Sequence, residues 1–124
     1  MIDLYTYDIF RKNTATLKEI SKDDSDCNNI KYMTESAETA VSFDKVKRIY
    51  VNALKLSEDN AASVDAVMQF PAGVFFIEFK NGKVNKQNVK DKMHDSLLLF
   101  CDIIGKNISY TRENISFILV YNIA

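Results

Sequence analysis

The sequence has few of the residue types that build zinc sites and disulfide-stabilised folds. Its 124 residues include two cysteines, one histidine, one proline, three glycines and no tryptophan. Cys27, Cys101 and His94 are too few for a tetrahedral zinc site made of cysteine and histidine. Two isolated cysteines also do not resemble a secreted disulfide framework. We therefore expect both cysteines to be free thiols.

Long apolar runs are missing too, and we expect no secretory leader. The chain starts Met1-Ile2-Asp3-Leu4-Tyr5, where a signal peptide would carry positive charge followed by an apolar stretch. No uninterrupted apolar run approaches the length that spans a bilayer. These absences predict a cytoplasmic protein that makes no contact with a membrane.

Charge of one sign is not in excess, because 16 basic and 17 acidic residues nearly cancel. The overall charge therefore does not mark the chain as a nucleic-acid-binding protein. The distribution is less even, since five lysines fall within a short stretch that holds a single acid, Asp91. These are Lys80, Lys83, Lys86, Lys90 and Lys92. Such a cluster is typical of a solvated helix face or of a surface that contacts phosphates.

What is present is enough for one compact domain, since 47% of the residues are apolar. Ser42 is a candidate N-cap for a helix that continues to about Leu56. Asn85 caps a second helix over 86–104, and Gly105 suits its end. The run 115–121 is rich in β-branched and aromatic residues and predicts an interior strand.

Two apolar runs, 64–70 and 74–80, predict a β-hairpin with Pro71 and Ala72 at its tip. Pairing of Phe70 with Gly73 then carries the register to Asp65 opposite Glu78. Side chains two apart share a face, so Lys80 is expected beside both acids. Facing carboxylates repel unless a cation lies between them, and oxygen ligands favour Mg²⁺ or Mn²⁺ over zinc.

Helix, hairpin, long crossover helix and final strand define an α/β fold over residues 42–124. Residues 1–41 are expected to be an extension of strands and loops that packs on this core, within a single domain. Their pattern is weaker. It predicts a strand or apolar anchor at 5–10, a helical turn at 16–21, a solvated loop at 21–26 and a strand at 29–34.

An acid on one strand followed by Glu-x-Lys on the next, here Asp65 and Glu78-Phe79-Lys80, resembles the PD-(D/E)XK nuclease superfamily. The stretch from Ser63 to Asp102 is also similar to a group of uncharacterised bacterial proteins with a nuclease-like core. It includes Glu78-Phe79-Lys80-Asn81-Gly82-Lys83 and Asp95-Ser96-Leu97-Leu98-Leu99. The resemblance implies a restriction-endonuclease-like core. That core has one more strand before the hairpin, which either the segment before Ser42 supplies or this chain lacks.

The resemblance also implies a metal-dependent nuclease, with DNA favoured over RNA as its substrate and with a role for each motif residue. Asp65 and Glu78 would bind Mg²⁺ or Mn²⁺ together with the backbone carbonyl of Phe79. Lys80 would orient or deprotonate the attacking water. Gln87 would be an auxiliary group at the start of the long helix. Phosphate contacts would be made by Lys83, Lys86 and Lys90.

Other interpretations stay open. Asp65, Glu78 and Lys80 could form a solvent-exposed cross-strand ion cluster that contributes roughly 0.2 to 1 kcal/mol and has no function. Apolar neighbours on both faces count against this, because unpaired charge in such surroundings costs roughly several kcal/mol. A further alternative is a non-catalytic nuclease-fold protein that binds nucleic acid or acts as an immunity or regulatory module. A homodimer or a protein partner is also open.

Overall fold

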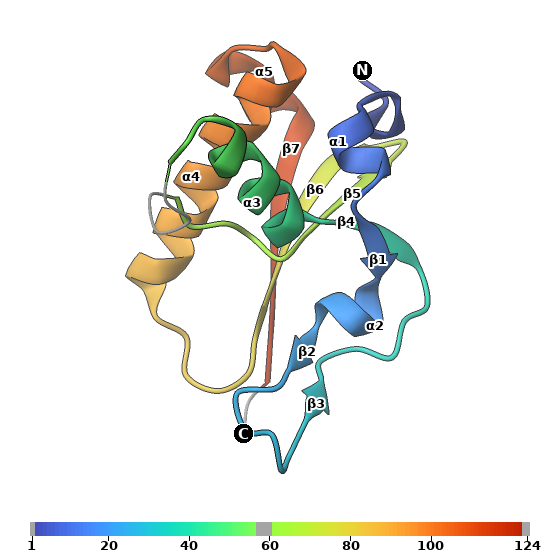
Figure 1. Ribbon diagram of the computed structural model, residues 1–124, viewed down its shortest axis with the longest axis vertical. Coiled ribbons are helices and arrows are strands. Elements are labelled where there is room, and N and C mark those ends of the chain that lie inside the picture. Colours follow the sequence, from blue (N-terminus) through green and yellow to red (C-terminus); the bar gives the residue numbers. More distant parts are fainter. Residues whose placement is uncertain (1, 57–60, 123–124) are drawn as a thin grey trace.

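The computed structural model describes residues 2–56 and 61–122. The centre of the fold is a mixed five-stranded sheet with the strand order β1-β4-β5-β6-β7 (Figure 1). The strands are β1 (Thr14–Thr16), β4 (Thr39–Ser42), β5 (Ala66–Phe70), β6 (Gly73–Lys80) and β7 (Ile115–Tyr121). Neighbours are antiparallel except β6 and β7, which are parallel. A second, two-stranded sheet pairs β2 (Lys22–Asp23) with β3 (Lys31–Tyr32). The predicted α/β class is therefore confirmed.

Helices cover both faces of the five-stranded sheet. The helical elements are η1 (Leu4–Thr6), α1 (Asp8–Arg11), α2 (Leu17–Ile20), α3 (Phe43–Ala53), α4 (Lys86–Ile104) and α5 (Ile108–Asn114). Residues of η1, α1, α3 and α4 share one apolar cluster with the strands, whereas α2 packs on a smaller cluster that includes Ala66 and Ile77. In the described part of the chain, no helix is long and apolar enough to cross a membrane.

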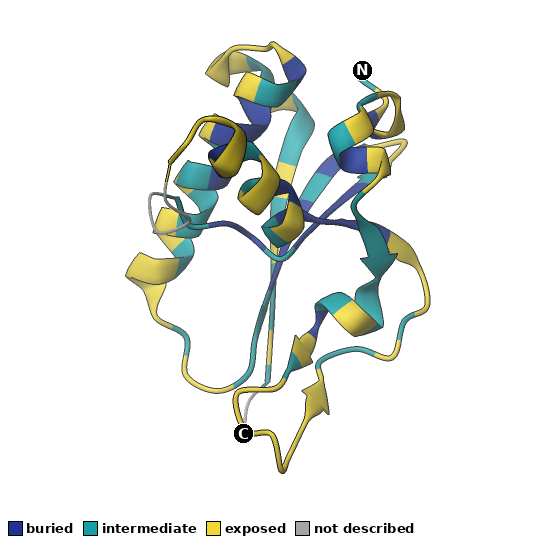
Figure 2. Cartoon of the chain, in the orientation of Figure 1, coloured by how far each residue is buried: buried dark blue, intermediate teal, exposed yellow. Residues whose placement is uncertain are grey.

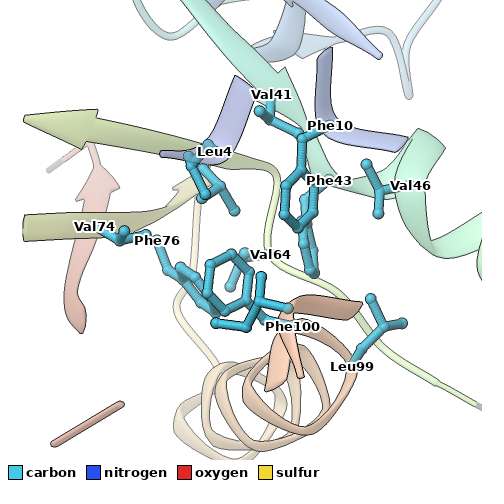
Figure 3. Packing of buried hydrophobic residues seen from close by; sticks show 12 residues of the cluster. Leu4, Phe10, Val41, Phe43, Val46, Val64, Val74, Phe76, Leu99 and Phe100 are labelled. Atoms are coloured by element: carbon cyan, nitrogen blue, oxygen red, sulfur yellow. The ribbon is translucent and has the colours of Figure 1, made fainter. Parts of the chain in front are cut away.

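Aromatic side chains fill the larger cluster (Figure 3). Phe76 of β6 lies 5.2 Å from Phe100 of α4 between ring centroids, and Phe100 stacks on Phe10 of α1 at 5.4 Å. Phe43 of α3 approaches Phe76 at 5.7 Å. These contacts hold α3 and α4 on the same side of the hairpin, so that polar residues of both helices reach its open end.

The predicted hairpin register is confirmed. Phe70 pairs with Gly73, and the ladder continues to Ala66 opposite Ile77, one step from Asp65 and Glu78. Gly73 has φ +141°, and a Cβ there would lie 2.8 Å from the carbonyl oxygen of Asn114. The turn therefore needs glycine for both its backbone conformation and its close approach to α5.

The long helix was also predicted correctly, with the bounds Lys86–Ile104. The side chain of Asn85 accepts hydrogen bonds from the backbone amides of Gln87 and Asn88, and Gly105 ends the helix with φ 71°. The helix that follows Ser42 begins at Phe43 as expected but ends at Ala53, earlier than about Leu56. Lys55 has φ 58°, a left-handed conformation that cannot continue a helix.

Two predictions about strands need correction or completion. The interior position expected for 115–121 is wrong, since within the described residues β7 pairs with β6 alone and lies at the edge of the sheet. Its Ile118 and Tyr121 side chains are 41% and 56% exposed. A strand also precedes the hairpin, since β4 ends at Ser42 and pairs with β5. This strand comes from the segment before the first long helix.

Residues 2–41 form short elements. The residues from Ser25 to Tyr32 in this segment are exposed (Figure 2). The stretch 5–10 is helical instead of a strand, but it acts as an anchor because Leu4 and Phe10 are fully buried. The helical turn at 16–21 is confirmed as α2, with the Thr16 side chain accepting from the Glu19 amide. Only two residues of 29–34 are a strand. The segment 57–60, which follows the first long helix, lies outside the described residues.

Candidate acidic site at the open end of the hairpin

Asp65 is held directly before β5 by backbone contacts with β6. Its amide donates to the carbonyl of Ile77 at 3.1 Å, which extends the ladder by one residue. Its Oδ2 atom accepts from the amide of Phe79 at 2.8 Å. Asp65 and Phe79, two of the predicted metal ligands, are thus in contact, but through the Phe79 amide and not through its carbonyl.

The environment of Asp65 disfavours its negative charge. Burial, followed by the neighbouring charge of Glu78, raises the pKa of Asp65 from 3.8 to about 7. Asp44 adds to this effect, while the Phe79 amide and the ammonium of Lys92 act against it. Asp65 and Glu78 therefore interact electrostatically, as their positions in the hairpin predict, and a nearby cation would favour the ionised form of Asp65.

Glu78 is the most deeply buried of the candidate acids, with 6% of its surface exposed. One carboxylate oxygen, Oε2, accepts from Lys92 Nζ at 2.5 Å. The other, Oε1, is buried and has no hydrogen-bond partner among the described residues. Buried polar atoms in folded proteins are normally paired, so this carboxylate oxygen is open to an ordered water, a ligand or an ion.

Lys92 was counted among the clustered lysines but not among the candidate site residues. Burial by itself lowers its pKa, but the hydrogen bond with Glu78 and the charges of Glu78, Asp65 and Asp44 more than offset this and raise it. The signal was its position on α4. Val89, Lys92 and Ser96 are spaced by three and four residues, which places the lysine on the stripe that faces the sheet.

Asp44, in the first turn of α3, is a second residue that sequence reasoning did not assign to the site. Its Oδ1 accepts a hydrogen bond from the Ser63 hydroxyl, and its charge raises the pKa of both Asp65 and Lys92. An acid in the first turn of a helix is common, so the sequence alone pointed to a stabilised helix start. Its proximity to the hairpin acids comes from the packing of α3 on the sheet.

The motif side chains open into two different hollows. Asp65 and Lys80 line a polar pocket of about 300 Å³, whose opposite wall is formed by residues 20–23, Ser25 and Met33. Glu78 lines a smaller hollow of about 110 Å³ beneath α4, together with Val89 and Met93. The structure therefore places Lys80 with Asp65, and Lys92 with Glu78.

A series of hydrogen bonds joins Asp23, in the wall of the polar pocket, to residues at the ends of β6 and β7. Asn81 donates to Asp23 at 2.8 Å, and Asn122 donates to Asn81 at 2.5 Å. Asn122 also accepts from the amide of Gly82 at 3.0 Å. Hydrogen bonds from the side chain of Ser25 and then from Asn81 lower the pKa of Asp23 to about 2. Figure 1 shows β2 at the same end of the molecule as the end of β7.

The remaining predicted residues lie apart from the pocket. Gln87 is exposed and donates to Asp91 at 2.9 Å on the first turns of α4. Lys86 and Lys90 line an apolar hollow of about 460 Å³ against Leu119 and Tyr121 of β7. Lys83 is exposed in the loop before α4. Both cysteines are free, as expected, with Cys101 buried and Cys27 exposed.

Comparison of the chain with protein-family models, with curated proteins and with solved structures finds no match. The resemblance to the PD-(D/E)XK superfamily therefore stays a prediction that depends on the motif residues and their arrangement.

The residues at the site fit a hard divalent cation in part. The unpartnered Glu78 oxygen is an available oxygen ligand, and a bound cation would offset the repulsion from Glu78 that helps to raise the pKa of Asp65. Within residues 2–56 and 61–122, however, no three acidic, histidine or cysteine side chains are grouped to hold a metal. A cation bound here would complete its coordination with backbone oxygen, water or substrate, as Mg²⁺ commonly does.

Proposed function

We propose that this protein is a metal-dependent phosphodiester hydrolase, a nuclease that acts on DNA rather than RNA. The observation that carries the proposal is the buried Glu78 carboxylate with an unpartnered oxygen, one residue beyond the last β5–β6 pair and close enough to Asp65 for its charge to raise the pKa of that group. The parallel β6–α4–β7 unit next to an antiparallel hairpin supports it, since this is the order that the superfamily resemblance implies.

In this proposal Asp65 and Glu78 hold one Mg²⁺ or Mn²⁺, with the Phe79 carbonyl as a backbone ligand. When bound, the ion would polarise a phosphate oxygen and lower the pKa of a coordinated water. The low solvent exposure of Glu78 keeps bulk water from its carboxylate, which strengthens the interaction of this group with any cation.

Lys80 lines the same pocket as Asp65, so its ammonium is available to a phosphate oxygen or to the attacking water. Lys83 is exposed in the loop before α4, Lys86 and Lys90 are exposed on its first turns, and all three would contact the nucleic-acid backbone. Gln87 already bonds to Asp91 and would have to leave it to take an auxiliary role.

Cleavage of duplex and single-stranded DNA and of RNA, with Mg²⁺, Mn²⁺ or EDTA, tests the proposal. Asp65→Asn, Glu78→Gln and Lys80→Met should each lower the rate at least about hundredfold, because each removes a charge needed in the transition state. Glu113→Gln, on the exposed surface of α5, is the matched control for Glu78→Gln. Absence of metal-dependent cleavage by the wild type, or full activity of all three variants, would contradict the proposal.

A non-catalytic protein of the same fold is the second candidate, favoured by one observation. Lys92 already neutralises Glu78, and the motif residues open into separate hollows. A binding module predicts salt-sensitive retention of nucleic acid that survives Asp65→Asn and Glu78→Gln. A protein-interaction module predicts neither retention of nucleic acid nor metal dependence, but a partner that co-purifies with the chain.

A further inference from the structure

The acidic site contains its own cation. Lys92 bonds to Glu78 and is close enough to Asp65 and Asp44 for both charges to act on its pKa. The ammonium, which extends from the sheet-facing side of α4, therefore bonds to Glu78 and lies within electrostatic reach of two further carboxyl groups. The ammonium compensates the buried charge of Glu78 without any bound ion, since an unpaired buried carboxylate is costly.

The two partners of this ion pair differ in their freedom to move. The Glu78 side chain is 7% exposed, whereas that of Lys92 is 34% exposed. A lysine ammonium sits on a flexible four-carbon stem and is strongly hydrated, so it can exchange a carboxylate for water by side-chain rotation. Glu78 has no comparable route to solvent, because Val64, Val89 and Met93 line the same hollow.

From this geometry we propose that the Lys92 ammonium holds the place of the divalent cation in the metal-free protein, and that cation binding at Glu78 displaces it. The inference rests on the proposed metal site and adds a competition within it. Two positive groups a few ångströms apart on the same carboxylate repel each other strongly in a buried setting. Lys92 is then a positioning residue that sets the cation concentration at which the site becomes loaded.

Calorimetric titration of Mn²⁺ at about pH 8, without nucleic acid, tests the displacement. Lys92→Met keeps the apolar stem and removes the charge. The dissociation constant of the variant for Mn²⁺ should therefore be about tenfold lower than that of the wild type. A factor of about ten corresponds to the loss of one partly buried charge interaction. Lys106→Met, which changes an exposed lysine beyond the far end of α4, should bind Mn²⁺ as the wild type does.

Each other result has a defined meaning. Equal or weaker binding by Lys92→Met, when the wild type binds Mn²⁺, overturns the displacement and leaves the nuclease proposal standing. If neither protein binds Mn²⁺, both proposals fail. Binding by the variant alone supports the displacement and speaks against nuclease activity of the wild type, whose site would hold no ion.

Circular dichroism covers the case in which Lys92→Met does not fold. If Mn²⁺ restores the helical signal of an unfolded variant, the ion is replacing the missing ammonium, as proposed. If millimolar Mn²⁺ leaves the variant unfolded, the ion does not take the place of Lys92 and the proposal is overturned.

Discussion

The buried carboxyl group of Asp65 makes stability depend on pH in a defined direction. Burial, with the charge of Glu78, raises its pKa from 3.8 to about 7 in the folded protein. In the unfolded chain the group titrates near its ordinary value, so the folded state binds this proton more tightly between about pH 4 and pH 7. The stability gained from the protonated carboxyl is complete below the ordinary pKa and is lost as pH rises through about 7.

The interval from 3.8 to about 7 sets the size of this effect. At about 1.4 kcal/mol for each pH unit, the free energy of unfolding should fall by up to about 4 kcal/mol across the interval. Asparagine cannot ionise, so Asp65→Asn removes this dependence. Any constant cost of the new amide beside the Phe79 amide is the same at every pH and cancels in the comparison.

Urea unfolding of wild type and Asp65→Asn, followed by circular dichroism from about pH 4.5 to 8, measures the effect. The variant should gain stability relative to the wild type as pH rises, whereas Asp24→Asn, at an exposed position, should run parallel to the wild type. Mn²⁺ should recover stability of the wild type at high pH if it binds Asp65. A stability difference that is the same at every pH would refute the account of Asp65.

Two further predictions concern the hairpin turn and the pocket wall. Gly73→Ala should lower the free energy of unfolding in urea by roughly 1 to 3 kcal/mol. The loss should be larger than for Gly82→Ala, because only at Gly73 would the added Cβ meet the Asn114 carbonyl. Equal losses of stability in the two variants would disprove that contact. Asn81→Ala removes the bond that holds Asp23, so limited trypsin digestion at Lys22 should become faster and the pKa of Asp23, followed by NMR, should rise from about 2. Unchanged digestion would show that Asn81 does not hold this wall.

The parts of the fold that sequence predicts well are those fixed by local chemistry. Asn85 and Gly105 bound α4 because capping depends on residues within one turn. Pro71 and Gly73 set the turn, and the turn alone fixes the register that brings Asp65 to Glu78. The prediction of the acidic pair needed no more than these signals.

The errors and omissions arise where the outcome depends on distant residues. The composition of β7 suits an interior strand, but its place at the edge depends on how many strands the rest of the chain supplies. Lys92 is one of several lysines in the sequence, and only the packing of α4 on the hairpin selects it as the partner of Glu78. The polar wall at 20–25 likewise depends on contacts between Asp23 and residues far along the chain.

The bonds that join Asp23, Asn81 and Asn122 also have a consequence for biosynthesis. Asp23 leaves the ribosome early, but the asparagine that steadies Asn81 comes 41 positions after it. A growing chain that already contains the hairpin and both of its acids therefore still lacks this support until β7 has been translated. The acids are synthesised before the asparagine that completes the hydrogen bonds beside them, so these bonds can form only after Asn122 has left the ribosome.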